Sequence, residues 1–348
     1  MREEPIRIGL IGAGGNTRSR HIPGFQACEG VEIVCVANRS TASAREVADE
    51  FGIPRVHRRW DEVLADPEVD AVCIGTWPYM HETLTVAALD AGKHVLCEAR
   101  MATDAAAAAR MLAVSRRHPG LTAQIVPAPH TLPVDRTLAA QIGDGFIGDL
   151  VALEAKVANR EFPDWDGPHH WRHDRTLSGN NVMNMGIWYE AMMRWVGPAI
   201  SVIALGQNVV RYRNDGAARR VGMTIPDHVD IIGEMAGGGQ MRFRVSSAVG
   251  FSSGTEVDVF GTEGTLALRR DDAGELVVLG ARRGEARLSP IAIEAGKRGR
   301  WRVEEEFVGA IRGLEPVTHT DLATGVEYMR WTDAVAESMR TGRLVRLG

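Results

Sequence analysis

The chain has 348 residues, of which 45% are apolar, and its formal net charge at pH 7 is −5. This length and composition predict two domains, each with its own core, and the negative charge argues against nucleic acid or an anionic membrane as a partner. The four cysteines form no C-x-x-C pair and no apolar run reaches the ~18 residues of a membrane span, so we expect a cytoplasmic protein without a structural metal or disulfide.

Residues 6–21 have the pattern of a nucleotide-binding turn. The apolar run 6–11 reads as a strand buried on both faces, and the turn 12–14 would let backbone N–H groups approach a pyrophosphate. A lone glycine fingerprint is weak, so a glycine turn in another kind of βα unit remains open at this point. The third small position is irregular, which predicts a loop one residue longer than usual. The residues expected to bind the cofactor here are Gly12, Gly14, Gly15 and Asn16.

The second apolar run, Val31–Ala37, ends where a Rossmann fold places the residue that contacts the adenosine ribose. The residues at this position are Asn38, Arg39 and Ser40. An acidic residue would repel a 2′-phosphate, whereas a neutral amide followed by a guanidinium tolerates and attracts one. The sequence therefore favours NADP over NAD as the cofactor. The alternative, in which Arg39 only stacks on the adenine or lies in water, stays open.

The remainder of the first half alternates between helices and buried strands, which predicts a parallel, doubly wound sheet with ligands at the carboxyl ends of its strands. Expected helices are 18–29, 41–51, 60–65, one that ends at residue 91, and 103–117 with Thr103 as N-cap; expected strands are 71–75, 93–98 and 121–126. Two strand ends carry further cofactor candidates, which are Thr76, Trp77, Pro78, His81 and Glu98.

A proline cluster at 127, 129 and 133 interrupts the alternation, so we place the domain boundary there, with domains 1–127 and 128–348. Beyond it, runs of alternating apolar and polar residues predict an antiparallel sheet with one solvated face. These runs are 150–157, 202–210, 229–235, 240–249, 255–259 and 265–268, and two helices, 302–312 and 322–339, follow. The predicted fold class is α/β: an N-terminal Rossmann sheet plus a C-terminal α+β domain with an open, mainly antiparallel sheet.

Residues 162–195 are rich in histidine, arginine and aromatic side chains. A loop of that composition favours a binding role, so we take it as the candidate substrate wall. Asn184 and Trp188 are four residues apart on the expected helix and therefore share one face. Stacking faces suit a sugar ring, and amides suit its hydroxyls. The expected substrate-binding residues are Arg100, Trp171, Arg172, Asn180, Asn184 and Trp188.

Several separated segments together resemble the Gfo/Idh/MocA oxidoreductases, named for glucose-fructose oxidoreductase and inositol dehydrogenase. They are the glycine loop with His21, Trp77-Pro78 with His81, AGKHVLCE at 91–98 with Met101-Ala102, the helix 181–197, EEFVGAIRG at 305–313, and the ending SMRTGRLVRL. The resemblance implies hydride transfer between nicotinamide and a small-molecule sugar, cyclitol or related polyol. It also implies contact of Glu98 with the nicotinamide ribose, and a homo-oligomer, a dimer or tetramer, formed through the C-terminal sheet.

The catalytic residues of that family do not carry over to this chain. Its Glu-Lys-Pro motif reads Glu98-Ala99-Arg100 here, and its Asp-x-Gly-x-His motif reads Asn184-Met185-Gly186-Ile187-Trp188. The lysine, aspartate and histidine are therefore absent together. Removal of a hydride from an alcohol needs a base for the hydroxyl proton, which contributes about a hundred- to ten-thousand-fold in rate.

Three interpretations account for the absence of these catalytic residues. In the first, His170 or His173 acts as the base and Arg100 stabilises an oxyanion or a carboxylate, so that the chain is an NAD(P)-dependent dehydrogenase or reductase with a rebuilt site. In the second, bound NAD transiently oxidises a sugar to permit elimination, epimerisation or glycosidic cleavage. In the third, the chain binds a nucleotide or ligand without catalysis. The first interpretation is the one we favour.

Overall fold

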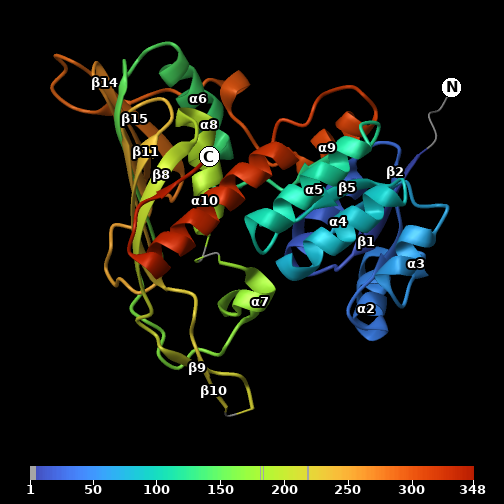
Figure 1. Cartoon of the computed structure of the whole chain (residues 1–348). Coiled ribbons are helices and arrows are strands. Elements are labelled where there is room, and N and C mark those ends of the chain that lie inside the picture. The colour runs from blue at the N-terminus through green and yellow to red at the C-terminus, as the bar shows by residue number, and fades with distance from the viewer. Residues whose placement is uncertain (1–4, 181, 183, 218) are drawn as a thin grey trace. The chain divides into compact units, whose positions relative to one another are not determined.

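A six-stranded sheet organises the first unit of the chain, and all its neighbouring strands run parallel (Figure 1). The strand order is β3-β2-β1-β4-β5-β6. Its strands are β1 (Ile6–Ile11), β2 (Val31–Ala37), β3 (Arg55–Val56), β4 (Ala71–Ile74), β5 (His94–Cys97) and β6 (Ala123–Ile125). The side chains of Ile8 and Leu10 in β1 are fully buried, because helices cover both faces of a parallel sheet.

The computed structural model describes residues 5–180, 182, 184–217 and 219–348. The chain divides into two units, Met1–Pro127 with Arg302–Met329, and Ala128–Trp301 with Arg330–Gly348. The sequence analysis assigned all residues after 127 to the second domain, whereas Arg302–Met329 returns to the first unit. Helix α9 (Val303–Ile311) packs there against α1 (Ile22–Ala27), where the rings of Phe25 and Phe307 meet edge to face with centroids 6.3 Å apart.

The other helical elements of the first unit follow the predicted alternation, except at η1. They are the π-helical turn η1 (Thr17–His21), α2 (Thr41–Phe51), α3 (Trp60–Ala65), the 3₁₀ turn η2 (Pro78–Met80), α4 (His81–Asp90), α5 (Ala105–Arg117) and the first part of α10 (Leu322–Thr341). Helices α4 and α5 lie side by side (Figure 1). The N-cap of α5 is Asp104 instead of Thr103, since the Asp104 carboxylate accepts the N–H of Ala107 at 2.8 Å.

The segment after the glycine turn differs from the single helix expected over 18–29. It forms the π-helical turn η1, with five residues from Thr17 to His21, and then the short helix α1. A π-helical turn is wider than an α-helical one and accommodates an additional residue. This geometry agrees with the irregular, longer glycine loop that the sequence indicates.

A nine-stranded sheet forms the second unit, in the order β16-β15-β14-β13-β7-β12-β11-β8-β17. Among its pairs only β7 and β12 run parallel, within the described residues, so the sheet is mainly antiparallel as predicted. Its strands are β7 (Leu150–Ala158), β8 (Ala199–Gln207), β11 (His228–Met235), β12 (Gln240–Ser246), β13 (Glu256–Gly261), β14 (Gly264–Arg270), β15 (Leu276–Arg282), β16 (Ser289–Pro290) and β17 (Val345–Arg346). A separate hairpin pairs β9 (Tyr212–Asn214) with β10 (Arg220–Gly222).

A buried ion pair joins two helices of this unit. Asp135 on α6 accepts hydrogen bonds from Arg194 at 2.6 Å and from the indole of Trp195 at 2.8 Å, both on α8. Arg194 also pairs with Glu190 at 2.7 Å. The helical elements of this unit are α6 (Leu132–Gly143), η3 (Trp171–His173), α7 (Arg175–Ser178), α8 (Met185–Val196), η4 (Ala295–Lys297) and the end of α10. Asn181, where the sequence analysis began its helix, lies outside the described residues.

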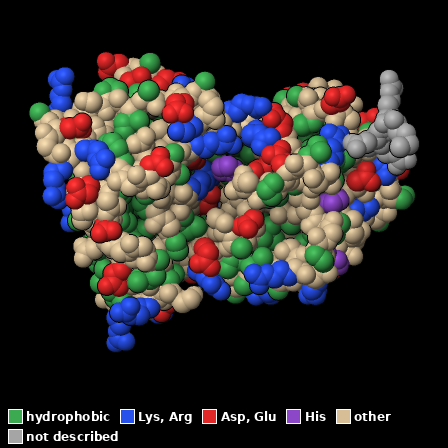
Figure 2. Space-filling model, turned by 90° about the horizontal axis from the view of Figure 1, so that it is seen from above, with side chains coloured by type: hydrophobic (Ala, Val, Ile, Leu, Met, Phe, Trp, Pro, Cys, Tyr) green, Lys and Arg blue, Asp and Glu red, His purple; other side chains and the backbone are tan. Residues whose placement is uncertain are grey.

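Acidic and basic side chains are interspersed over the face of the molecule shown in Figure 2, in keeping with a net charge of −5. Within the described ranges, no helix combines the length and the apolar character that crossing a membrane requires.

Candidate functional site

Two loops at the carboxyl ends of β1 and β4 pack closely against each other. Gly12 has a φ of +86°, and a Cβ at this position would lie 2.8 Å from the backbone nitrogen of Thr76. In the facing loop, a Cβ on Gly75 would lie 2.4 Å from the carbonyl oxygen of Gly12. Gly12 is required for both its backbone conformation and the space around it, and Gly75 for the space alone. The tight turn that the sequence indicated is therefore built from both loops.

The next two glycines leave the loop open to a ligand. Gly14 and Gly15 are exposed. A Cβ on Gly15 would meet no atom within 4 Å, and one on Gly14 would meet only the Gly75 carbonyl at 3.8 Å. A glycine-rich turn at the start of a helix that keeps its backbone accessible is suited to a pyrophosphate. The geometry of the loop therefore fits a dinucleotide.

Asn38, at the end of β2, holds the glycine loop in place. Its side-chain oxygen accepts the N–H of Ala13 at 2.7 Å, and its amide nitrogen donates to the hydroxyl of Ser43 at 3.0 Å. Ser40 is the N-cap of α2 and accepts the N–H of Ser43 at 3.2 Å. Two of the three residues expected to face the adenosine ribose therefore have structural partners.

Arg39 is the cationic member of that group. It is exposed, and its guanidinium lies over the ring of Trp77 at 5.4 Å from the centroid. Trp77 is half-buried in the loop after β4, and the neighbouring Pro78 is buried. An aromatic face beside a guanidinium offers both a stacking surface and a partner for a phosphate.

His81, which we expected near the cofactor, is fully buried between two backbone segments. Its Nδ1 faces the carbonyl oxygen of Arg100 at 2.9 Å, and its Nε2 faces that of Thr76 at 2.9 Å. Burial lowers the pKa of His81, while these backbone contacts favour the charged ring and act against that change. The structure places His81 as a link between the loops that follow β4 and β5.

Glu98, at the end of β5, lies in a network that the sequence analysis did not identify. Its Oε1 accepts the amide of Asn16, and it faces Nε2 of His21 at 3.0 Å. Nδ1 of His21 contacts the carboxylate of Glu304 on α9 at 2.5 Å. The sequence analysis used His21 and the tail after residue 304 only as marks of resemblance, because no local pattern relates residues 283 positions apart.

In the second unit, the two candidate bases cap a short helical turn. His170 Nδ1 accepts the N–H of Arg172 at 3.3 Å, and His173 Nδ1 accepts the N–H of His170 at 3.1 Å. Burial, followed by the charge of Arg213, lowers the pKa of His173 to about 4. Burial, followed by the charge of Arg172, also lowers the pKa of His170. Both rings are therefore neutral at physiological pH, and because Nδ1 accepts a backbone N–H in each, the ring proton lies on Nε2.

The candidate substrate residues of this unit have different environments. The guanidinium of Arg172 lies over the ring of Trp171 at 4.3 Å. Asn180 donates to Asp333 at 3.2 Å, and Asn184 is the N-cap of α8. Trp188 is only 3% exposed, since it stacks on the imidazole of a residue that the sequence analysis missed.

That residue is His130, at the start of the second unit. Its ring is parallel to the indole of Trp188, with centroids 4.9 Å apart and an angle of 7° between the planes. Burial, followed by the charges of Arg270 and Arg194, lowers the pKa of His130 to about 4. The proline-rich segment around His130 could have drawn attention to it, but nothing in the sequence indicated its partner. Arg100, the remaining substrate candidate, belongs to the first unit and is 4% exposed.

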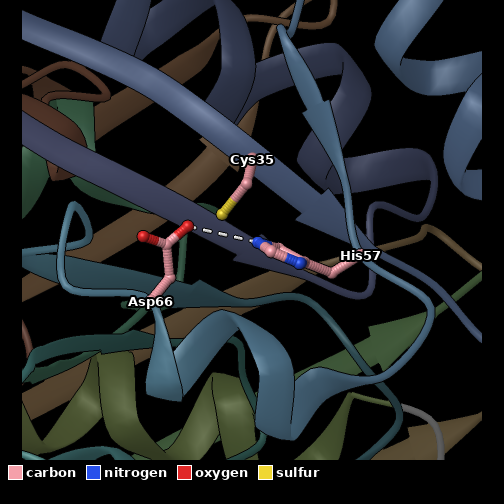
Figure 3. A group of neighbouring side chains, drawn as sticks. All are labelled: Cys35, His57 and Asp66. Carbon is pink, nitrogen blue, oxygen red and sulfur yellow. Dashed lines mark hydrogen bonds and ion pairs between the residues drawn. The ribbon is translucent and has the colours of Figure 1, made fainter.

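Within the part of the chain that the structure describes, one group could supply three metal ligands: Cys35, His57 and Asp66, whose donor atoms lie within 4.8 Å of one another (Figure 3). The Asp66 carboxylate already pairs with His57 at 3.2 Å and with Arg55 at 3.1 Å. Burial, followed by the charge of Asp66, raises the pKa of Cys35 to about 12. The Arg55 guanidinium pairs with the Asp66 carboxylate and the Cys35 thiol keeps its proton, so these residues form a network of ion pairs and hydrogen bonds.

An all-parallel sheet in this strand order, with a glycine turn at the carboxyl end of β1, defines a dinucleotide-binding Rossmann domain. The family is shown by two matches: residues 6–123 match "Oxidoreductase family, NAD-binding Rossmann fold" and residues 136–267 match "GFO/IDH/MocA C-terminal domain". The chain belongs to the GFO/IDH/MocA family of nicotinamide-dependent oxidoreductases. The expected family, fold class and enzyme class are therefore confirmed.

Three similar proteins illustrate the range of the family. "Uncharacterized oxidoreductase ORF334" of Rhizobium meliloti is 30% identical over 191 residues, which span 55% of this chain but only 56% of that protein. Inositol 2-dehydrogenase of Acidothermus cellulolyticus is 26% identical over 99% of this chain and 95% of its own length. The solved structure of levoglucosan dehydrogenase with NADH and L-sorbose has a TM-score of 0.86 at 20% identity, covers 99% of this chain and 100% of its own, and shows the shared fold.

Proposed function

We propose that the protein is an NADP(H)-preferring oxidoreductase that transfers a hydride between nicotinamide and a sugar, cyclitol or related polyol. The observation that supports the cofactor preference lies at the end of β2, where Asn38, Arg39 and Ser40 include no acidic residue that could bind the ribose hydroxyls. Asn38 is bonded to the glycine loop, and the guanidinium of Arg39 lies over Trp77. A 2′-phosphate on the adenosine ribose would pair with that guanidinium, whereas NAD has no group that uses it.

The polyol class is supported by the names of relatives. Inositol 2-dehydrogenase, levoglucosan dehydrogenase and the trans-1,2-dihydrobenzene-1,2-diol dehydrogenase of Bos taurus, 28% identical over 76% of this chain and 72% of its own length, all carry names of hydroxylated cyclic compounds. The ring of Trp171 and the amides of Asn180 and Asn184 are our candidates for binding such a substrate. Trp188, which the sequence analysis included, is buried against His130 and offers a ligand almost no surface.

The cofactor, when bound, supplies the hydride acceptor or donor, and the chain itself must handle the hydroxyl proton. We assign this role to His170 or His173. In the structure Nδ1 of each neutral ring accepts a backbone N–H and Nε2 carries the ring proton, so the ring must release its cap before Nδ1 takes up the hydroxyl proton. We assign to Arg100 the stabilisation of the oxygen from which the proton leaves. These residues take over the roles of the lysine, aspartate and histidine of the family's motifs, whose positions are occupied here by Ala99, Asn184 and Trp188.

The reaction is tested by incubating the protein with pooled sugars, cyclitols, sugar acids and glycosides and with both oxidised cofactors, while nicotinamide absorbance and masses are followed. We expect one component to lose two hydrogens and an equal amount of reduced cofactor to appear. Loss of water, or release of an aglycone, without net reduction would refute the simple dehydrogenase and support transient oxidation. No change despite cofactor binding would support a non-catalytic binder.

The variants His170→Gln and His173→Gln distinguish the two candidate bases, and His118→Gln, at the half-exposed C-cap of α5, is the control. Loss of the true base is expected to lower kcat by about a hundredfold or more and to remove the acid limb of the pH profile, with KM little changed. The control and the other histidine variant keep the limb. If both histidine variants retain the acid limb of the pH profile of activity, neither His170 nor His173 is the base.

We also propose a cytoplasmic homo-oligomer, and the second unit supports the oligomer. Ile203 on β8 and Ile232 on β11 are paired neighbours that are 40% and 47% exposed, and Leu205 on β8 is 75% exposed. Exposed apolar residues gathered on one sheet are typical of an interface. Leu205→Lys is expected to reduce the mass measured by light scattering, whereas Leu314→Lys, at a similarly exposed leucine of the first unit, keeps it. A monomeric wild type would contradict the proposal.

A further inference from the structure

His21 lies between two carboxylates in the interior of the first unit. Nδ1 is 2.5 Å from Oε1 of Glu304, and Nε2 is 3.0 Å from Oε1 of Glu98. The His21 side chain is 0% exposed, that of Glu304 is 3% exposed and that of Glu98 is 13% exposed. A ring that donates to two acceptors at once must carry a proton on both nitrogens. An imidazolium in this position donates one hydrogen bond to the buried Glu304 and one to the partly buried Glu98.

The packing of α1 against α9 positions Glu304 beside His21. Glu304 lies in the first turn of α9, three residues before Phe307, whose ring packs on Phe25 of α1. Gly24, beside Phe25, has no side chain, and a Cβ there would meet the carboxylate of Glu304 at 2.6 Å. A larger residue at Gly24 would displace the carboxylate from His21. The ion pair is thus part of how the returning segment, Arg302–Met329, joins the first unit.

The charges of the partners keep this ring protonated at neutral pH. Burial lowers the pKa of His21, but the hydrogen bonds to Glu304 and Glu98 and the charges of both carboxylates outweigh burial and raise it to about 9. Burial raises the pKa of Glu98, while His21 and then Asn16 lower it below its usual value. Among the described residues, the other titratable groups that interact with these carboxylates include His81 and the thiols of Cys28, Cys73 and Cys97. Burial lowers the pKa of His81 and raises the pKa values of the three thiols, so all four groups are neutral near neutral pH.

The same carboxylate of Glu98 reaches the nucleotide loop. Its Oε1 accepts the amide of Asn16, which immediately follows the open glycines, and its Oε2 accepts the N–H of Ala99 at 3.1 Å. His21, fixed by Glu304, therefore determines where the Glu98 carboxylate lies, and Glu98 determines where Asn16 lies. Three elements distant in sequence, η1, the end of β5 and α9, meet at this one ring.

We propose that the imidazolium of His21 is a positioning residue of the cofactor site, which makes nicotinamide dinucleotide affinity depend on Glu304 of α9 and on a proton at His21. The inference rests on the proposed function, since it takes the glycine loop and Glu98 as the place where the dinucleotide binds. Loss of the proton leaves one ring nitrogen without a hydrogen to donate, so that one carboxylate faces a lone pair and moves away. The loop then loses the partner that orders Asn16.

The test compares the wild type with Glu304→Gln and with Glu305→Gln, the same chemical change at the exposed neighbouring residue of α9. Dissociation constants for NADP and NAD are measured by calorimetric titration from about pH 6 to about pH 10, a range that brackets the His21 transition. For the wild type and for Glu305→Gln, we expect a constant affinity at neutral pH that weakens as pH rises through about 9. Glu304→Gln is expected to weaken at a pH lower by about one unit or more, since it removes one of the two anions.

The ring itself provides a second readout, because the pKa of His21 can be followed by NMR in the same proteins without cofactor. A lower pKa in Glu304→Gln, together with the displaced affinity profile, supports the proposal. His21→Gln, which leaves two buried carboxylates without a cation, is expected to bind weakly at all pH values, and should it fail to fold, Glu304→Gln alone decides the matter.

Two results would overturn the inference, and they differ. If the wild type and Glu304→Gln bind dinucleotide with the same dependence of affinity on pH, the positioning role is refuted and the proposed function stands. Wild-type protein that binds neither dinucleotide at any pH would refute the proposed function and the inference with it.

Discussion

The buried ion pair of His21 makes the stability of the protein depend on pH in a direction opposite to that of ordinary carboxylate pairs. The perturbation we consider is Glu304→Gln, which removes one of the two anions around the ring but preserves the size of the side chain. In the wild type the His21 pKa rises from 6.5 in the unfolded chain to about 9 in the folded protein. The folded state therefore binds the proton more tightly than the unfolded state does.

The magnitude follows from this difference. A change of one pKa unit corresponds to about 1.4 kcal/mol, so the proton at His21 contributes about 3 kcal/mol to the free energy of unfolding. The contribution is complete below pH 6.5, declines as pH rises, and is lost as pH passes through about 9. Glu304→Gln is expected to cost about 1 to 3 kcal/mol below neutral pH and much less above about pH 9.

The assay is urea unfolding of the wild type, Glu304→Gln and Glu305→Gln at a series of pH values. Subtracting the unfolding free energies of two proteins at the same pH cancels the contributions of the titratable groups that they share. The expected signature is a difference in unfolding free energy between wild type and Glu304→Gln that shrinks with rising pH, and no such trend for Glu305→Gln. A difference that stays constant with pH, or that grows as pH rises, would refute the account of a protonated His21.

Three further predictions concern the cofactor site, the second unit and the missing lysine. Arg39→Asp is expected to weaken NADP binding about tenfold or more and to leave NAD binding equal or better, measured as dissociation constants, while Arg116→Asp on α5 changes neither. Asp135→Ala, which removes the acceptor of the Trp195 indole and one of the two carboxylates that pair with Arg194, should lower the unfolding free energy by about 3 kcal/mol, against almost no change for Asp144→Ala at the exposed end of α6. Ala99→Lys alone should not raise kcat, because the aspartate and histidine are also missing; a large gain would contradict the rebuilt site.

The strands of the first unit could be predicted from sequence because a sheet buried on both faces produces continuous apolar runs. Val31–Ala37 and Thr41–Phe51 have the bounds that the pattern indicates. The strand β3, with two residues, and the π-helical turn η1 could not be predicted, because neither has enough residues to form a periodic pattern. In the second unit the alternation indicated an antiparallel sheet, but the parallel pairing of β7 with β12 depends on contacts that local patterns do not contain.

The candidate site shows the same limit. Residues of the glycine loop and of the strand ends could be named from sequence, because their chemistry follows from local spacing. The partners that define their roles could not: His21 with Glu304, and Trp188 with His130, are pairs of residues far apart in the chain. The carbonyl oxygens that face His81 were also hidden, since backbone atoms leave no mark in the sequence.

The most direct test of the central claim is a calorimetric titration of the wild-type protein with NADP and with NAD at neutral pH. We predict that both bind and that NADP binds more tightly, because Arg39 pairs with the 2′-phosphate and no carboxylate repels it. Tighter binding of NAD, or equal affinities that Arg39→Asp leaves unchanged, would contradict the assignment of this loop to NADP.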